Sequence, residues 1–207
     1  MADRSKSYIY LKGFANGCSM HNTLKALHIA EKFHKDQFRN DGEPYINHPL
    51  RVANELINLG IKDDAIVAAA LLHDILEDCE FEYGGKELVT QYHLEQEVLD
   101  VIRLLTKHKG VNADEYYKTV LSDKRSAIIK ISDRCHNIST MVGVFTIERM
   151  KKYLKETEEY VLPLCSNVKD LYPEYSNAAT VMKYHIRSMC DAVKYCIKCS
   201  ENTEKSK

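Results

Sequence analysis

The chain has 207 residues, with 29 Lys and Arg against 30 Asp and Glu, a formal net charge of −1 and a pI near 6.7. This length suits one domain with a substantial core, so we expect a single domain over residues 1–207. Nucleic acids and anionic membrane surfaces attract positively charged proteins, so the composition argues against a general binder of either.

The sequence gives no sign of export or membrane insertion. No stretch approaches the roughly 20 consecutive apolar residues that span a bilayer, and the N-terminal segment lacks the apolar core of a signal peptide. We therefore expect a cytoplasmic protein. The seven cysteines are odd in number and scattered, which favours reduced thiols over a disulfide framework. The CIKC motif (Cys196, Cys199) lacks a second ligand pair at zinc-finger spacing and is a weak metal candidate.

Apolar residues recur at helical spacing along most of the chain, and no stretch alternates with the period of a strand. The predicted fold class is therefore an all-α helical bundle. Helix starts are marked by Asn22 or Thr23, Pro49, Asp63 or Asp64, and Asp123. In chain order, the expected helices are 22–37, 49–60, 65–78, 86–107, 113–121, 124–141, 147–164 and 177–199, followed by a disordered tail at 200–207.

The helix expected over 65–78 should be central, because it is apolar all round until His73. The last helix should dock through one apolar face. The residues assigned to that face are Val181, Ile186, Met189 and Val193.

The segment AALLHDILEDCE places four ionisable residues directly after this apolar run. Taking a charge out of water costs several kcal/mol unless it is paired, and a bound metal ion is one solution. On a helix, His73 and Asp74 lie about 100° apart and can reach one ion. Glu77 and Asp78 come one turn later, which makes a compact group of ligand and proton-transfer side chains.

Two further residues complete the predicted metal site. His48 stands at a helix start just before Pro49, and Asp133 shares a helix face with Lys130, Asn137 and Thr140. The mixed nitrogen and oxygen set favours Mn²⁺, Fe²⁺, Zn²⁺ or Co²⁺ over Ca²⁺. An adjacent His-Asp pair is common by itself, and HDILED could also be the polar end of an ordinary helix. The predicted metal ligands are His48, His73, Asp74 and Asp133.

Taken together, these motifs resemble the HD-domain hydrolase module of the RelA/SpoT family, which degrades the alarmones ppGpp and pppGpp. Arg39, then GEPYI and His48-Pro49, match the first family motif. HDILED matches the second motif, and DRCHN, which begins at Asp133, matches the third. The likeness runs from about residue 24 to residue 165. The segment after Cys165 is too short for the family's synthetase domain, so the chain resembles the stand-alone small alarmone hydrolases.

The resemblance implies a role for each matched residue. The metal would be Mn²⁺, and Glu77 and Asp78 match the pair that positions and activates the attacking water. Arg39 matches an arginine near the nucleotide, and Asn137 and Thr140 match residues that line its ribose and phosphate pocket. The implied reaction removes pyrophosphate from the 3′ position of a small-molecule guanine nucleotide, ppGpp or pppGpp. Lys130 either offsets phosphate charge or is an ordinary solvated helix charge.

Some alternatives stay open at this point. Asn40 and Asp41 replace the basic and small residues often found in the family, and Asp41 either accepts hydrogen bonds from guanine or faces solvent. Another nucleotide, such as NADPH dephosphorylated by an HD phosphatase, is the second candidate substrate. A catalytically silent HD domain that senses nucleotides is the third interpretation. Arg134 is expected to be structural and His136 to pack or hydrogen-bond, and the sequence does not fix an oligomeric state.

Overall fold

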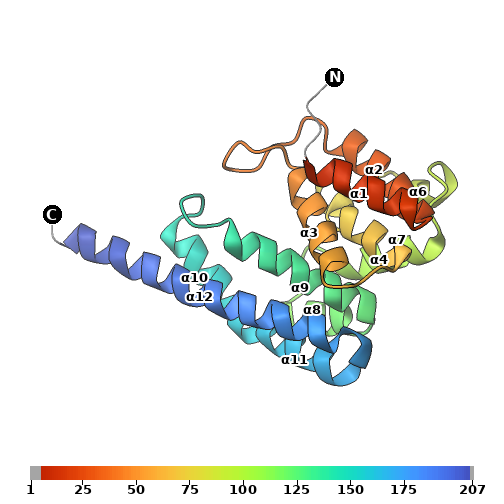
Figure 1. The fold of residues 1–207 in the computed structure, drawn as a ribbon. Coiled ribbons are helices and arrows are strands. Elements are labelled where there is room, and N and C mark those ends of the chain that lie inside the picture. Colours follow the sequence, from red (N-terminus) through yellow and green to blue (C-terminus); the bar gives the residue numbers. More distant parts are fainter. Residues whose placement is uncertain (1–5, 206–207) are drawn as a thin grey trace. The chain divides into compact units, whose positions relative to one another are not determined.

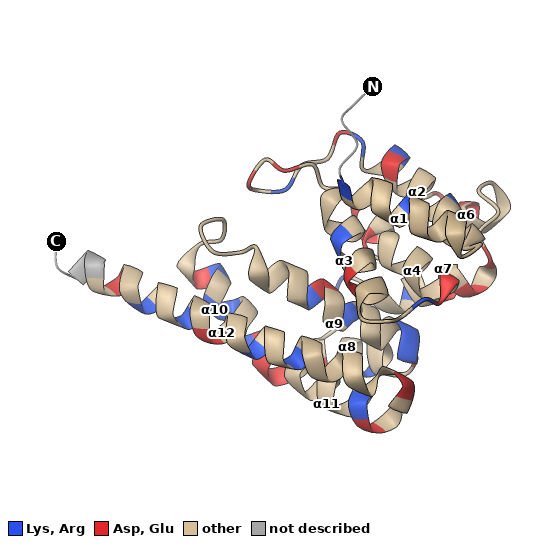
Figure 2. Cartoon of the chain, viewed as in Figure 1, with Lys and Arg blue, Asp and Glu red and all other residues tan. Residues whose placement is uncertain are grey.

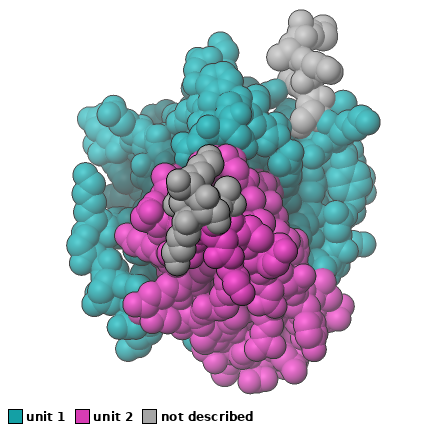
Figure 3. All heavy atoms as spheres, turned by 90° about the vertical axis from the view of Figure 1, so that its left-hand side faces the viewer, with its two compact units in different colours: residues 1–130 teal, residues 131–207 magenta. Residues whose placement is uncertain are grey.

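The computed structural model describes residues 6–205, and the regular structure in that range is helical (Figure 1). The expected all-α fold is confirmed, with one isolated β-bridge between Phe38 and Pro44. No helix in the described range is long and apolar enough to cross a membrane. The chain divides into two compact units, Met1–Lys130 and Ile131–Lys207 (Figure 3). The expectation of one domain stays a prediction.

The first unit is built around one short apolar helix, α4. This helix contacts α2, α3 and α7, and its residues after Asp64 are buried. Figure 2 marks the positions of the Lys, Arg, Asp and Glu residues along the helices of the chain. The first helix of the chain, α1, comes before α2 and was not predicted. The helices of this unit are α1 (Lys6–Gly17), α2 (His21–Phe33), α3 (Asn47–Asn58), α4 (Asp64–Leu71), α5 (Ile75–Asp78), α6 (Lys86–Thr90), α7 (Gln96–Leu105) and α8 (Ala113–Leu121).

Two aspartates at the start of α4 have separate tasks. The side chain of Asp63 accepts a hydrogen bond from the Ile66 N–H and caps α4, which confirms one of the two predicted caps. The Asp64 carboxylate accepts the backbone N–H groups of Asn22 and Thr23, each at 2.8 Å. Asn22 and Thr23 lie inside the first turn of α2, so their predicted capping role is wrong. The free N–H groups of that turn are satisfied by another helix instead.

Two helices expected to be continuous are broken. The chain leaves α4 at Leu72 and begins α5 only at Ile75, so His73 and Asp74 lie in a turn rather than within one long helix. The segment 86–107 is interrupted between α6 and α7, where His93 has a φ of +56°. That left-handed conformation is incompatible with a continuous right-handed helix.

The second unit contains the end of α9 and the helices that come after it. α9 (Lys124–Ser139) begins in the first unit and continues into the second. The other elements are α10 (Ile147–Glu156), a π-helical turn η1 (Thr157–Val161), α11 (Leu162–Leu171), a 3₁₀ turn η2 (Pro173–Tyr175) and α12 (Ser176–Lys205).

α12 packs mainly on α11, through a face that matches the predicted one only in part. Val181 is 47% exposed and Met189 is half-buried, whereas Ile186 and Val193 are buried as expected. The buried stripe consists of Met182, Ile186, Cys190, Val193 and Ile197. α12 also extends through residues 200–205, which were expected to form a tail, and residues 206–207 lie outside the described range.

Candidate metal and nucleotide site

Three of the four predicted metal ligands converge in the first unit. His48 is the second residue of α3 and His73 comes just after α4, and each side chain is 2% exposed. Ligand atoms of His48, His73 and Asp74 all lie within 4.8 Å of one another, so these residues could hold one metal ion. The Nε2 atoms of the two histidines are 3.1 Å apart, and Asp74 Oδ2 lies 3.5 Å from His48 Nε2 and 3.0 Å from His73 Nε2.

The surroundings of His73 fix which ring nitrogen is available. Its Nδ1 lies 2.8 Å from the Ala70 carbonyl oxygen, which accepts a hydrogen bond and therefore requires a proton on Nδ1. When His73 is neutral, as a metal ligand must be, its lone pair is on Nε2, which faces His48 and Asp74. Histidine ligands in metal sites are held in this way, through a hydrogen bond from the other nitrogen. The turn that breaks the helix after Leu71 provides this geometry.

Asp74 is held in its ionised form. Burial alone would raise its pKa, but the charge of His73 and hydrogen bonds from His48 and His73 outweigh that effect and hold the pKa well below its usual range. Tyr45 donates its hydroxyl hydrogen to Asp74 Oδ2 at 2.6 Å. Desolvation and the nearby Asp74 carboxylate raise the pKa of Tyr45, so its hydroxyl stays a donor. A dry pair of imidazoles beside an ionised carboxylate suits a borderline divalent cation.

Glu77 and Asp78 lie one turn beyond this cluster, at the end of α5, and both are exposed. Glu77 Oε1 accepts the backbone N–H of Lys107 at 2.5 Å. Desolvation around the carboxyl group raises the pKa of Glu77, and the Lys107 N–H counteracts this only in part. A carboxylate with a raised pKa accepts a proton more readily near neutral pH. Asp78, together with Gln37, Phe38 and Tyr45, lines a shallow pocket.

Arg39 and Asp41 belong to a tight loop that approaches Tyr45. The Arg39 N–H donates to the Glu43 carbonyl at 2.8 Å, and the Gly42 N–H donates to the Arg39 carbonyl at 2.9 Å. Asp41 Oδ1 accepts the Glu43 N–H at 2.9 Å. One oxygen of Asp41 therefore stabilises the loop itself, a role that was not predicted. The assignment of both residues to substrate binding stays a prediction.

Two lysine side chains lie against the same aromatic ring, that of Tyr116. The Nζ atoms of Lys107 and Lys130 lie 5.3 and 5.6 Å from the ring centre of Tyr116. The charge of Lys130 also lowers the pKa of Glu77, against the larger effect of desolvation. The Lys130 ammonium group therefore lies against the Tyr116 ring and acts on the Glu77 carboxylate. Lys107 was missed because it holds Glu77 through its backbone, which leaves no side-chain pattern to recognise.

The remaining predicted residues lie in the second unit. Asp133 is 4% exposed, and its Oδ1 accepts a hydrogen bond from Asn137 Nδ2 at 2.5 Å. The Thr140 hydroxyl donates to the His136 carbonyl at 3.0 Å. A fourth ligand role for Asp133 and nucleotide contacts by Asn137 and Thr140 stay predictions. Arg134 is 3% exposed and binds Glu156, so the geometry agrees with its expected structural role.

Comparison with known proteins identifies one family. The model of a family described as HD domain matches residues 26–164. The chain is 38% identical over 148 residues to a guanosine-3′,5′-bis(diphosphate) 3′-pyrophosphohydrolase of Aquifex aeolicus, covering 68% of this chain and 20% of that protein. It is 37% identical over 147 residues to a GTP pyrophosphokinase of Streptomyces coelicolor, covering 68% of this chain and 17% of that protein. The chain thus spans about a fifth of the length of these relatives.

A solved structure has the same fold. It is described as a metazoan ortholog of SpoT that hydrolyzes ppGpp, and it aligns with a TM-score of 0.62 at 22% identity. The alignment covers 81% of this chain and 93% of that one. At this identity the likeness shows the fold alone.

Proposed function

Because the chain belongs to the HD-domain family, we propose that it is a metal-dependent phosphohydrolase that removes pyrophosphate from the 3′ position of ppGpp or pppGpp. The observation that carries this proposal is the convergence of His48, His73 and Asp74. Glu77 and Asp78 follow His73 and Asp74 by one helical turn. The names of the Aquifex aeolicus relative and of the structurally similar metazoan protein support the choice of substrate.

His48, His73 and Asp74 would hold the ion, with Asp133 as the fourth ligand, and Mn²⁺ is the proposed metal. When bound, such an ion lowers the pKa of water and neutralises charge that develops on a phosphoryl group. Glu77, whose pKa desolvation raises, would take the proton of the attacking water, and Asp78 would help to orient that water. Lys107 and Lys130 would offset the remaining negative charge of the pyrophosphate.

The proposal is tested by incubating Mn²⁺-loaded protein with ppGpp, pppGpp, the adenine counterpart of ppGpp, and NADPH. We expect GDP from ppGpp, GTP from pppGpp, and intact pyrophosphate in both reactions. His73→Ala serves as the inactive control. Release of single phosphate, or faster turnover of NADPH than of ppGpp, would instead identify an HD phosphatase for another nucleotide. Binding without turnover of any of these compounds would identify a silent nucleotide sensor.

A further inference from the structure

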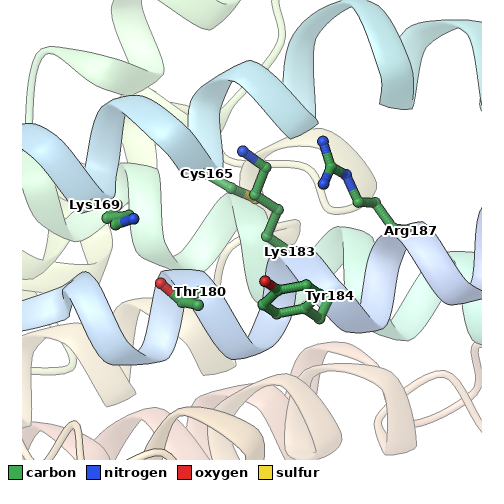
Figure 4. A pocket seen from close by; sticks show the side chains of 6 residues that line it. All are labelled: Cys165, Lys169, Thr180, Lys183, Tyr184 and Arg187. Carbon is green, nitrogen blue, oxygen red and sulfur yellow. The ribbon is translucent and has the colours of Figure 1, made fainter.

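A small basic pocket lies between α11 and α12 in the second unit, and the proposed function does not use it. Its volume is about 120 Å³. Figure 4 shows Lys183 and Arg187 extending from α12 toward α11, with Lys169 opposite on α11. The lining residues are Cys165, Lys169, Thr180, Lys183, Tyr184 and Arg187.

The positive charge of this pocket is not compensated locally. No carboxylate lines it, and none of Lys169, Lys183 and Arg187 has an ion pair with an acidic residue of the described range. Cys165, which also lines the pocket, is 1% exposed. Burial raises the pKa of this thiol to about 12, although the charges of Lys183 and Arg187 favour its ionised form. The thiol is therefore neutral near pH 7 and leaves three positive charges around the pocket.

One of these charges is already held in place. Lys183 Nζ donates to Ser166 Oγ at 2.5 Å, and Ser166 Oγ in turn donates to the Leu162 carbonyl at 3.2 Å. An ammonium group has three hydrogens, so two of them stay available for a ligand. A side chain that is fixed before binding loses less conformational entropy when it binds. The Lys183 amine is thus a preorganised donor.

The donor set and the size of the pocket define the class of ligand. The Arg187 guanidinium offers the planar fork that matches phosphate oxygens, and a lysine ammonium adds a compact point charge. Pockets for drug-sized ligands are about 300–1,000 Å³, so this one is too small for a nucleoside. A phosphate or diphosphate group fits the charge and the space. The ring of Tyr184, 69% exposed at the rim, leaves room for the rest of a larger molecule outside.

We propose that the pocket between α11 and α12 is an anion site that binds a phosphate or diphosphate group through Lys169, Lys183 and Arg187. The group is either a free ion or the end of a phosphorylated small molecule. The site lies wholly within the second unit and does not depend on the proposed hydrolase activity.

The test uses inorganic pyrophosphate and the full chain in a chelator, so that no metal centre contributes to binding. Isothermal titration calorimetry, with chloride matching the ionic strength, should show saturable binding to the native chain. Lys183→Gln with Arg187→Gln should weaken this binding by about tenfold or more, because it removes two charge-assisted contacts. The matched control is Lys152→Gln with Lys198→Gln, which removes the same charge from exposed residues without ion-pair partners in the described range. This control should bind as the native chain does.

Arg187→Gln alone provides a second test, since Arg187 is exposed and its replacement should not disturb folding. It should also weaken binding, and GDP as a second titrant distinguishes a free diphosphate from one carried by a nucleotide. No saturable binding of either compound to the native chain, or equal binding by the native and Lys183/Arg187 variants, would overturn the proposal. Equal loss in the Lys152/Lys198 control would also overturn it, because the effect would then be one of net charge.

Discussion

Tyr45 is the residue that connects the loop after α2 to the candidate metal site. Its hydroxyl donates to Asp74 Oδ2 at 2.6 Å and so orients the carboxylate. Removing such a supporting contact typically costs about 10–100-fold in metal affinity. We therefore expect Tyr45→Phe to weaken Mn²⁺ binding by about tenfold, measured by competition with a chelator. Tyr10→Phe, which removes an exposed hydroxyl contact to Asn58, is the control, and equal affinity in both variants would contradict the role of Tyr45.

Substitution of Glu77 tests proton transfer separately from metal binding. If Glu77 accepts the proton of the attacking water, Glu77→Gln should retain metal yet lose hydrolysis by about a hundredfold or more. Desolvation raises the pKa of Glu77, so the ionised, proton-accepting form predominates only above that raised pKa. Native activity should therefore increase with pH through a value above the ordinary pKa of about 4.3. The measurements are metal content, kcat and its pH profile, with the exposed Glu80→Gln as control. Near-normal turnover in Glu77→Gln would place the base elsewhere.

At the residue scale, part of the reasoning that led to the predicted metal ligands was wrong. His73 and Asp74 were placed one after the other on a continuous helix, whereas they lie in the turn between α4 and α5. The turn matters because it brings His73 Nδ1 to the Ala70 carbonyl. Periodicity does not predict such a break, since the apolar pattern continues through Leu72 and Ile75. Tyr45 was recognised only as part of the GEPYI motif, so its contact with Asp74 was missed.

At the scale of secondary-structure elements, the side chain of Arg134 connects α9 to the π-helical turn η1. Its guanidinium donates to Glu156 Oε1 at 2.6 Å and to Thr157 Oγ1 at 3.0 Å, and it stacks 3.9 Å from the centre of the Tyr153 ring. Local widening to a π-helix often marks a site where side chains insert or a function is placed. Arg134 therefore fixes the part of α9 that carries Asp133.

Arg134→Met should reduce the free energy of unfolding by about 1.5–3 kcal/mol, the usual cost of losing a hydrogen bond to a charged group. Glu156 is 29% exposed, so water can solvate its carboxylate in part after the change, and the loss stays in this range. Urea denaturation measures the effect. The control is Arg149→Met, because Arg149 stacks 3.7 Å from the Phe145 ring centre but is exposed. An equal loss in both variants would mean that stacking, and not the contacts to Glu156 and Thr157, stabilises this region.

Some helix ends and buried faces were predicted correctly and others were not. The cap of α4 was narrowed to Asp63 or Asp64, and Asp63 is the cap, because capping is a local interaction between residues three apart. The start of α2 was misassigned because its partner, Asp64, lies more than forty residues away in sequence. The buried face of α12 was misassigned for a related reason. Val181 and Met182 are both apolar, and only packing decides that Met182 is 1% exposed and Val181 47%.

For the whole molecule, the fold class was predictable because the helical period runs through almost the entire sequence. The all-helical pattern in the described range agrees with that expectation. The division into two compact units was not predicted, because α9 continues from one into the other without a linker rich in Gly, Pro or Ser. A boundary within a helix leaves no signal in composition. The basic pocket between α11 and α12 was missed because its cations come from two helices separated in sequence.

Metal binding should be visible in the stability of the chain. An ion that binds only the folded state stabilises it by RT ln(1 + [L]/Kd), or about 2.7 kcal/mol at one hundred times Kd. Excess Mn²⁺ should therefore raise the Tm above that in a chelator, and His73→Ala should abolish the gain. Histidine ligands bind a metal only when neutral, so the gain should be present at neutral pH and lost as the pH falls and the imidazoles become protonated. His28→Ala, an exposed histidine on α2, should keep the full gain. Differential scanning calorimetry at several pH values measures this, and an identical Tm with Mn²⁺ and with chelator would refute a metal site built on His48, His73 and Asp74.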